Sequence, residues 1–221
     1  MQKTFYITIE GCDGCGKTTT VKGLLTYLQE LTKKVLLTKE FGSEHNLFCS
    51  SARKIALSSE YSTDEIAGQL MFAAIARQHQ QKVIKPAKES GEIDIILSDR
   101  GMDTNFAYGP VHQIPQKTIN QIFSIAYSDS IVPDVTIFLD SPPALSRKRR
   151  AARAPEQFNN GGIDRVESKG PAFQEKVRAK FLALAKKHSD RIKVIKINEK
   201  MSPQDVLNEV ITILKDVKVL E

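Results

Sequence analysis

The sequence predicts an α/β fold, in which a parallel five-stranded sheet carries helices on both of its faces. The main observation is an alternation along the chain: short apolar, β-branched runs are followed by longer segments whose apolar residues recur at helical spacing. The second observation is size and composition. The chain has 221 residues, 41% of them hydrophobic and 26% charged, which is ordinary for a globular protein. At this length a single domain, residues 1–221, is the default expectation.

Five runs are expected to form the strands. Each is short, rich in Ile, Val, Leu or Phe, and bounded by polar or turn-forming residues. The third run leads into Asp99 and the fourth into Asp140. In chain order the predicted strands cover residues 5–10, 35–38, 93–97, 135–139 and 192–197.

Helical patterns fill most of the intervening segments. Thr63 is the expected N-cap of a long helix that reaches about Lys85, with Pro86 near its end. Ser202 is the expected cap of the closing helix. The other predicted helices cover residues 17–31, residues 51–57 and the segment that begins at the Pro142–Pro143 pair.

The least regular stretch is residues 154–162, which contains the sequence Asn-Asn-Gly-Gly. Because it lies between two helical segments, we expect a mobile loop there. This loop would be the centre of a lid at about residues 147–167.

Composition excludes several classes of protein. No run approaches ~18 uninterrupted apolar residues, so no membrane span is expected, and no secretory signal is recognisable. Three cysteines are too few for a disulfide scaffold and fit a reducing, cytoplasmic location. The net charge of +6 favours anionic ligands, a description that fits both nucleotides and nucleic acids.

A phosphate-binding motif follows the first predicted strand. Residues 11–18 match G-x-x-x-x-G-K-[ST], in which glycines let backbone N–H groups surround a phosphate and the following helix adds its positive end. Lys17 would reach the β- and γ-phosphates of ATP, and the Thr18 hydroxyl would ligate Mg²⁺. The expected ATP-binding residues are Gly11, Cys12, Asp13, Gly14, Cys15, Gly16, Lys17, Thr18 and Thr19.

The same motif contains Cys12 and Cys15 at C-x-x-C spacing, which alone would suggest redox chemistry or half of a metal site. The chain has no second cysteine pair. We therefore expect the two thiols to fill the loop.

Charged residues elsewhere complete the expected site. Ligands of doubly wound sheets bind outside the carboxyl ends of the strands, which makes Asp99 a partner for Mg²⁺ and Arg100 a partner for a phosphate. Asp140 also follows a strand, and we expect a structural role for it. A basic cluster at residues 147–153 would supply positive charge during phosphoryl transfer or form a solvated face.

Several motifs, taken in order, resemble thymidylate kinases of the nucleoside monophosphate kinase group of P-loop proteins. Residues 5–19 resemble the family's opening loop, in which an Asp, here Asp13, follows the first Gly by two. Residues 99–108 resemble its segment D-R-x-x-x-S/T-x-x-A-Y, and residues 133–140 its strand P-D-L-T-x-x-L-D. Residues 164–167 resemble the lid motif D-R-I-E, and residues 173–181 the helix after it. The resemblance implies a P-loop NTPase-type fold with a mobile lid.

The resemblance also implies the reaction: transfer of the γ-phosphoryl group of ATP, with Mg²⁺, to a deoxynucleoside 5′-monophosphate, above all dTMP to dTDP. Asp13 would face the sugar 3′-hydroxyl, Arg100 would hold the acceptor phosphate and Phe72 would stack on the base. Lys39, Phe41, Arg77, Thr104, Asn105 and Tyr108 would complete the acceptor pocket. Cys15 stands where one branch of the family has an Arg, so the catalytic charge would come from Arg149, Arg153 and Arg165. The family implies an adenine site around residues 198–201 and is often dimeric, which implies a homodimer.

Three departures from the family pattern affect these expectations. Residues 39–43, Lys-Glu-Phe-Gly-Ser, replace R-E-P-G-G, and the lid is several residues longer than in common bacterial forms. The family's base-contacting Arg falls at Ala76, and Arg77 is turned about 100° away on the helix. Either a local bulge returns Arg77 to the pocket or the base is read differently. A pocket without that donor would discriminate less against other bases or 5-substituted pyrimidines.

Three functions therefore remain open. The leading one is a dTMP kinase, and the second is a kinase for other, several or 5-modified deoxynucleoside monophosphates. The third is a P-loop regulatory NTPase, which would leave the acceptor-side residues without a purpose. We expect small-molecule substrates, with neither a membrane nor a nucleic acid as partner.

Overall fold

The computed structural model describes residues 3–41, 46–58, 60–61, 63–152, 166 and 169–220. Its five strands are all parallel and lie in the order β2-β3-β1-β4-β5, which confirms the predicted sheet. Each strand matches a predicted run to within about two residues. The strands are β1 (Phe5–Glu10), β2 (Val35–Lys39), β3 (Ile95–Asp99), β4 (Val135–Asp140) and β5 (Ile192–Lys196).

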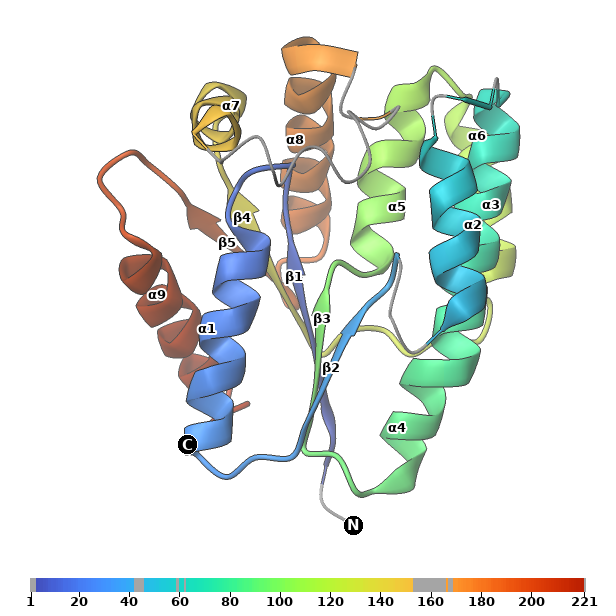
Figure 1. The fold of residues 1–221 in the computed structure, drawn as a ribbon. Helices are drawn as coiled ribbons and strands as arrows, with labels where there is room; N and C mark the ends of the chain where they lie inside the picture. Colours follow the sequence, from blue (N-terminus) through green and yellow to red (C-terminus); the bar gives the residue numbers. More distant parts are fainter. Residues whose placement is uncertain are drawn as a thin grey trace.

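Successive side chains of the central strands point to opposite faces of the sheet, where they pack against different helices. Ile7 and Ile9 of β1 pack with α1 (Lys17–Glu30) and α9 (Pro203–Asp216). On the opposite face, Tyr6 of β1 packs near α4 (Lys85–Ser90), and Phe138 of β4 packs against α8 (Gly170–Lys187). In Figure 1 the sheet runs between these layers with the carboxyl ends of its strands at the top. Both ends of the chain lie in the lower half, away from the loops that follow β1 and β3.

Helix starts follow the side chains that cap them. α2 (Leu47–Leu57) begins four residues earlier than predicted, because Asn46 accepts a hydrogen bond from the Cys49 N–H. The prediction of Thr63 as a cap is wrong: Asp64 caps α3 (Glu65–His79), and its carboxylate accepts from the N–H groups of Ile66 and Ala67. Ser202 caps α9 as predicted, in a reciprocal capping box with Asp205.

Pro86 does not end the long helix. A π turn over Gln80–Ile84 joins α3 to α4, and the helix continues to Ser90, where Gly91 closes it at a φ of 69°. Within the π turn the Lys85 N–H bonds to the Gln80 carbonyl, five residues back. Because proline has no N–H to donate and its ring crowds the preceding turn, a wider turn ahead of Pro86 is physically favourable.

Two helices were missed from the sequence, α5 (Met102–Tyr108) and α6 (Gln116–Ala126), together with a 3₁₀ turn at Gly109–His112. α5 is short and contains Thr and Asn, which have weak helix propensity. α6 carried a usable signal: its buried residues Ile119, Ile122, Phe123 and Ala126 have the spacing of one helical face.

The predicted lid falls mostly outside the described residues, because 153–165 and 167–168 are not among them. Its described part is the end of α7 (Pro143–Ala151), together with Ala152 and Val166. This helix carries the start of the basic cluster and has Pro143 in its first turn. That the whole chain is one domain with a closing lid stays a prediction. None of the described helices is both long enough and apolar enough to cross a membrane.

Candidate active site

A cavity of about 240 Å³ opens at the carboxyl ends of β1, β2 and β3. It brings together most of the residues that the sequence assigned to the two substrates. Because parallel strands deliver their following loops to one edge of the sheet, residues far apart in the chain meet there. The predicted residues that line the cavity are Asp13, Gly14, Lys17, Thr18, Lys39, Phe41, Phe72, Asp99, Arg100, Thr104, Asn105 and Tyr108.

The phosphate loop has the glycines that its path requires. Gly14 has a φ of 84°, and a Cβ there would come within 2.6 Å of the Ser146 carbonyl oxygen. Lys17 is largely buried at the start of α1, and its ammonium donates to the carbonyl oxygens of Gly11 and Cys12 at 3.1 and 2.9 Å. This arrangement holds a cation at the mouth of the loop, as phosphate binding requires.

Oxygen ligands for a hard cation lie beside the loop. The Thr18 hydroxyl donates to Asp99 Oδ2 at 3.2 Å, and Asp99 is nearly buried where β3 ends. In the part of the chain that the structure describes, no cluster of three or more His, Cys, Asp or Glu could hold a metal on its own. One hydroxyl and one carboxylate fit Mg²⁺, which usually completes its octahedron with water and substrate phosphates.

Asp13 and Arg100 form the central ion pair of the cavity. Arg100 Nη2 lies 2.5 Å from Asp13 Oδ1, while the Tyr108 hydroxyl and the Gln174 amide donate to Asp13 Oδ2 at 3.5 and 3.3 Å. Burial alone would raise the pKa of Asp13, but the neighbouring cations Arg100 and Lys17 lower it overall. Asp13 is therefore a carboxylate at neutral pH and can accept hydrogen bonds from a ligand hydroxyl.

Glu10 holds Arg100 in an uncommon backbone conformation. Arg100 has a φ of 72°, a left-handed value that is rare for a residue with a Cβ. The completely buried carboxylate of Glu10 accepts from the Gly101 and Thr104 N–H groups at 2.8 and 3.1 Å, and from the Thr104 hydroxyl at 2.6 Å. Glu10 thus fixes the start of α5 and the position of Arg100, a role that sequence reasoning missed.

An aromatic wall faces the charged side of the cavity. Phe41 and Phe72 meet edge to face, with ring centroids 5.6 Å apart, and both line the cavity. Such a wall suits a flat, apolar ring surface such as a nucleobase. Asn105 of α5 and Gln69 of α3, both buried, are polar residues in the same lining.

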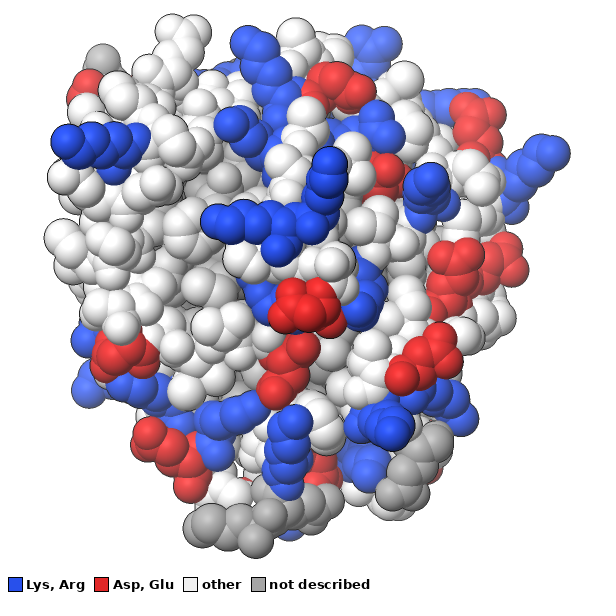
Figure 2. Space-filling model, turned by 180° about the vertical axis from the view of Figure 1, so that it is seen from behind, with Lys and Arg blue, Asp and Glu red and all other residues white. Residues whose placement is uncertain are grey.

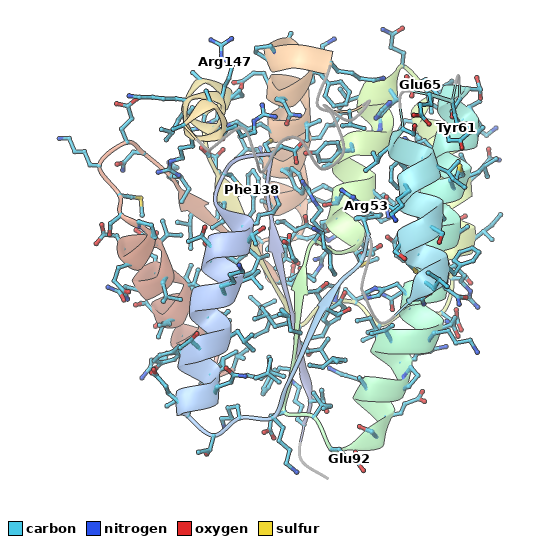
Figure 3. All side chains as sticks on the ribbon, in the orientation of Figure 1. Arg53, Tyr61, Glu65, Glu92, Phe138 and Arg147 are labelled. Atoms are coloured by element: carbon cyan, nitrogen blue, oxygen red, sulfur yellow. The ribbon has the colours of Figure 1, made fainter. Side chains whose placement is uncertain are left out.

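Cations gather around the cavity. Burial lowers the pKa of Lys39, and the nearby cations Arg53 and Arg100 lower it further, against the opposing effect of Asp99. Figure 3 shows Arg53 extending from α2 toward the centre of the molecule, whereas Arg147 of α7 extends outward. The cavity is lined by the cations Lys17, Lys39, Arg53, Arg100 and Arg150 and by the carboxylates Asp13 and Asp99. This excess of positive charge suits a polyphosphate.

Two of these cations were not predicted as site residues. Arg150 belongs to the predicted basic cluster, but the prediction assigns the catalytic charge to Arg149 and not to Arg150. Arg149 donates to the Asn198 carbonyl at 3.5 Å and does not line the cavity. No sequence pattern identified Arg53 as a site residue, since a single Arg on an amphipathic helix is expected to be exposed to solvent. Arg153 and Arg165 lie outside the described residues.

The structure does not place Arg77 in the cavity. Its guanidinium bonds to Asp129 on the surface, where Lys85 binds the same carboxylate, and the Arg77 side chain is 40% exposed. The π turn lies after Arg77, at Gln80–Ile84, so it does not change the register of Arg77 relative to Phe72. Ala76 is completely buried. Arg77 therefore does not line the cavity with the other predicted acceptor residues, because the helix turns its side chain away and the π turn comes too late in the chain.

The remaining loop residues do not line the cavity with their own atoms. Cys12 and Cys15 are buried free thiols, and burial raises the pKa of Cys12 to about 12, so its thiol is protonated at neutral pH. The loop-filling interpretation fits this placement. The roles of Gly11, Cys12, Cys15, Gly16 and Thr19 in ATP binding stay predictions.

Two buried carboxyl groups give the fold a distinct pH dependence. Burial is the main cause that raises the pKa of Glu40 to about 8 and that of Glu10 to about 7, from an ordinary value of 4.5. Between pH 4.5 and about pH 8 the folded chain holds protons on these carboxyl groups that the unfolded chain has released. The free energy of unfolding therefore falls as pH rises through this range. Burial also lowers the pKa of His79 to about 4, which acts in the opposite direction below pH 6.5.

Glu40→Gln should therefore flatten the decline of stability above pH 6.5, since glutamine cannot ionise. Urea denaturation at pH 6.5, 7.5 and 8.5 measures the slope. Glu30→Gln, the same change at an exposed position, is the control and should retain the wild-type slope. A Glu40→Gln slope equal to that of the wild type would contradict the assigned burial effect.

Known proteins resemble this chain both in sequence and in the arrangement of its helices and strands. The model of the family described as thymidylate kinase matches residues 9–210. The chain belongs to the thymidylate kinase family. It is 35% identical to the thymidylate kinase of Chlorobaculum parvum over 218 residues, which cover 97% of each chain. It is also 35% identical to that of Mycoplasma capricolum over 211 residues, covering 95% of this chain and 93% of the relative.

A solved structure extends the comparison to the fold. The crystal structure of thymidylate kinase from Ehrlichia chaffeensis superposes with a TM-score of 0.71 at 29% identity, covering 96% of this chain and 99% of that one. The P-loop NTPase-type fold is thereby confirmed. The chain is an ATP-dependent nucleoside monophosphate kinase.

Proposed function

We propose that this kinase transfers the γ-phosphoryl group of ATP to dTMP, giving dTDP. The observation that carries the proposal is the single cavity that joins the phosphate loop, at Lys17 and Thr18, to the acceptor residues Arg100 and Phe72. A donor and an acceptor bound in one cavity are close enough for direct transfer.

The chemistry requires positioning and charge neutralisation. An oxygen of the dTMP phosphate forms a new bond to the γ-phosphorus of ATP while the bond from that phosphorus to the bridging oxygen breaks, and the bridging oxygen leaves on ADP. The attacking oxygen is already anionic, so no general base is needed. We assign Lys17 and Arg150 to the transferring group, Arg100 to the acceptor phosphate and Asp13 to the 3′-hydroxyl.

Mg²⁺ is the cofactor that the oxygen ligands favour. The Thr18 hydroxyl and the Asp99 carboxylate would hold it, directly or through water. When bound, Mg²⁺ neutralises charge on the β- and γ-phosphates.

A second candidate function is phosphorylation of other, several or 5-modified deoxynucleoside monophosphates. The buried Ala76, at the position where the family pattern has a base-contacting Arg, favours it. Loss of a strong donor from a buried base pocket reduces discrimination between bases.

An acceptor panel tests both candidates. ADP release coupled to NADH oxidation is measured with ATP, Mg²⁺ and each deoxy- and ribonucleoside monophosphate in turn. We expect turnover that depends on the acceptor and is highest with dTMP. Equal rates with several bases would support the second candidate, and ATP turnover without any acceptor would support a regulatory NTPase and contradict the kinase assignment.

We also propose that the kinase is a homodimer. Exposed apolar residues gather on neighbouring helices: Leu47, Phe48 and Ile55 on α2, Ile66 and Leu70 on α3, and Ile125 on α6. Figure 2 shows a broad, mostly uncharged area on the left, the side to which these helices turn in that view. Such a patch is typical of a surface that a second protein covers.

The three buried thiols fit the cytoplasmic location expected from the cysteine count.

A further inference from the structure

A buried hydrogen-bond cluster lies behind the acceptor side of the cavity. It joins Asn105 of α5 to Tyr127, the residue after α6, and to Glu40, the residue after β2. Asn105 Nδ2 lies 2.5 Å from the Tyr127 hydroxyl and 3.4 Å from Glu40 Oε1, and the Tyr127 hydroxyl itself donates to Glu40 Oε1. Glu40 is completely buried and Asn105 is 4% exposed.

The donors and acceptors of this cluster define which way the Asn105 amide faces. The Tyr127 hydroxyl gives its only hydrogen to Glu40, so its remaining capacity is to accept, and it accepts from the Asn105 NH₂ group. Both contacts of Asn105 in the cluster use this NH₂ group. Asn105 lines the cavity, whereas Glu40 and Tyr127 do not. The carbonyl oxygen Oδ1 is therefore the amide atom left for the cavity.

The ring of Tyr127 is itself held in place. It stacks on Phe123 at 6.1 Å between centroids and packs against Phe106 at 5.8 Å. A hydroxyl on a fixed ring, bonded to a buried carboxyl group, is an effective support for a neighbouring amide. A rotated Asn105 would lose both contacts and leave polar groups unpaired away from water.

We propose that Tyr127 and Glu40 are positioning residues that fix the orientation of the Asn105 amide and thereby set the base preference of the kinase. The inference rests on the proposed function, since it concerns the base of the acceptor. An amide oxygen facing the base accepts a hydrogen bond from the N3–H of thymine or uracil. Cytosine presents an unprotonated N3 at the same place, and the two acceptors repel each other.

The cluster gains importance from the replacement at position 76. With Ala76 buried and Arg77 bonded to Asp129, no arginine of α3 reaches the base. Discrimination between pyrimidines then depends more heavily on the polar residues that do line the cavity there. Asn105 is one of these residues, and its orientation is set by neighbours outside the cavity.

Tyr127→Phe is the direct test, because it removes the hydroxyl and keeps the packed ring. We expect the KM for dTMP to rise about 10-fold, as for the loss of one hydrogen bond, with little change in kcat. The ratio of kcat/KM for dTMP to that for dCMP should fall by a similar factor. Tyr27→Phe, which removes a hydroxyl from α1 far from the cavity, is the matched control and should match the wild type.

A double-mutant cycle shows whether Tyr127 acts through Asn105. The dissociation constant of dTMP is measured by calorimetry in the wild type, Tyr127→Phe, Asn105→Ala and the double variant. We expect Tyr127→Phe to have no further effect once Asn105 is alanine. Equal effects of Tyr127→Phe in both backgrounds would overturn the proposal, because they would indicate a general structural role.

Glu40→Leu supplies an independent variant should Tyr127→Phe fold poorly. It removes the oxygen that accepts from Tyr127 and Asn105, so we expect the ratio of kcat/KM for dTMP to that for dCMP to fall, as in Tyr127→Phe. Wild-type selectivity in either variant would refute the positioning role. If the wild type itself fails to phosphorylate dTMP, the proposed function is what fails, and that result is seen before any variant is compared.

Discussion

Lys17→Ala is expected to lower kcat by about 10³-fold or more while the fold is retained. The ammonium of Lys17 is held at the mouth of the phosphate loop by the carbonyl oxygens of Gly11 and Cys12. In the transition state, charge accumulates on the transferring phosphoryl group, and a cation placed there in advance stabilises it more than water does. The measurement is the steady-state rate of dTDP formation with both substrates saturating.

Lys22→Ala is the matched control, since Lys22 lies on the same helix with an exposed side chain. Its kcat should be close to that of the wild type. Thermal unfolding of both variants confirms that neither change disrupts the sheet or α1. A rate for Lys17→Ala within about tenfold of the wild type would contradict the assignment of the phosphate loop.

Arg100→Ala should lower kcat/KM for dTMP by about 10²- to 10³-fold, through a higher KM as well as a lower kcat. Arg100 is placed by Glu10 and the start of α5, and it contacts Asp13 and the Gly11 carbonyl within the cavity. Its loss removes the partner of the acceptor phosphate and leaves the Asp13 carboxylate without its ion pair. Arg100→Lys should recover only part of the activity, because an ammonium cannot form the two-pronged contact of a guanidinium.

Arg77→Ala provides the comparison within the same residue type. Its guanidinium binds Asp129 at the surface and does not line the cavity, so the KM for dTMP should stay within about threefold of the wild-type value. A tenfold or larger rise in that KM would show that Arg77 reaches the acceptor and would contradict the position described for α3. Unchanged kinetics in Arg100→Ala would contradict the assignment of Arg100 to the acceptor phosphate.

Local sequence patterns were enough to predict the sheet and the phosphate loop. Strands such as β3 and β4 are buried along their whole length and therefore appear as mostly apolar runs. The phosphate loop carries glycines that its backbone requires, so a motif of consecutive residues was enough to predict its function. Asp99 and Arg100 were found for a related reason, because they immediately follow a recognisable strand.

Features formed by distant residues were harder to predict. Glu10 ends a strand, yet its role depends on N–H groups more than 90 residues away, at Gly101 and Thr104. The Tyr127 hydroxyl and the Glu40 carboxyl group meet only because α6 packs beside α3 and α5 and β2 lies at the edge of the sheet. Arg53 reaches the cavity through the packing of α2 on α3. Such pairings are tertiary, and no periodicity or spacing within one segment encodes them.

The placement of the chain ends has a practical consequence for experiments on this kinase. Both ends lie in the half of the molecule away from the catalytic edge of the sheet. A purification tag, a fluorescent reporter or a surface tether joined at either end would leave the entrance for nucleotides unobstructed. Immobilised protein can therefore be used to follow nucleotide association directly, with attachment through either end.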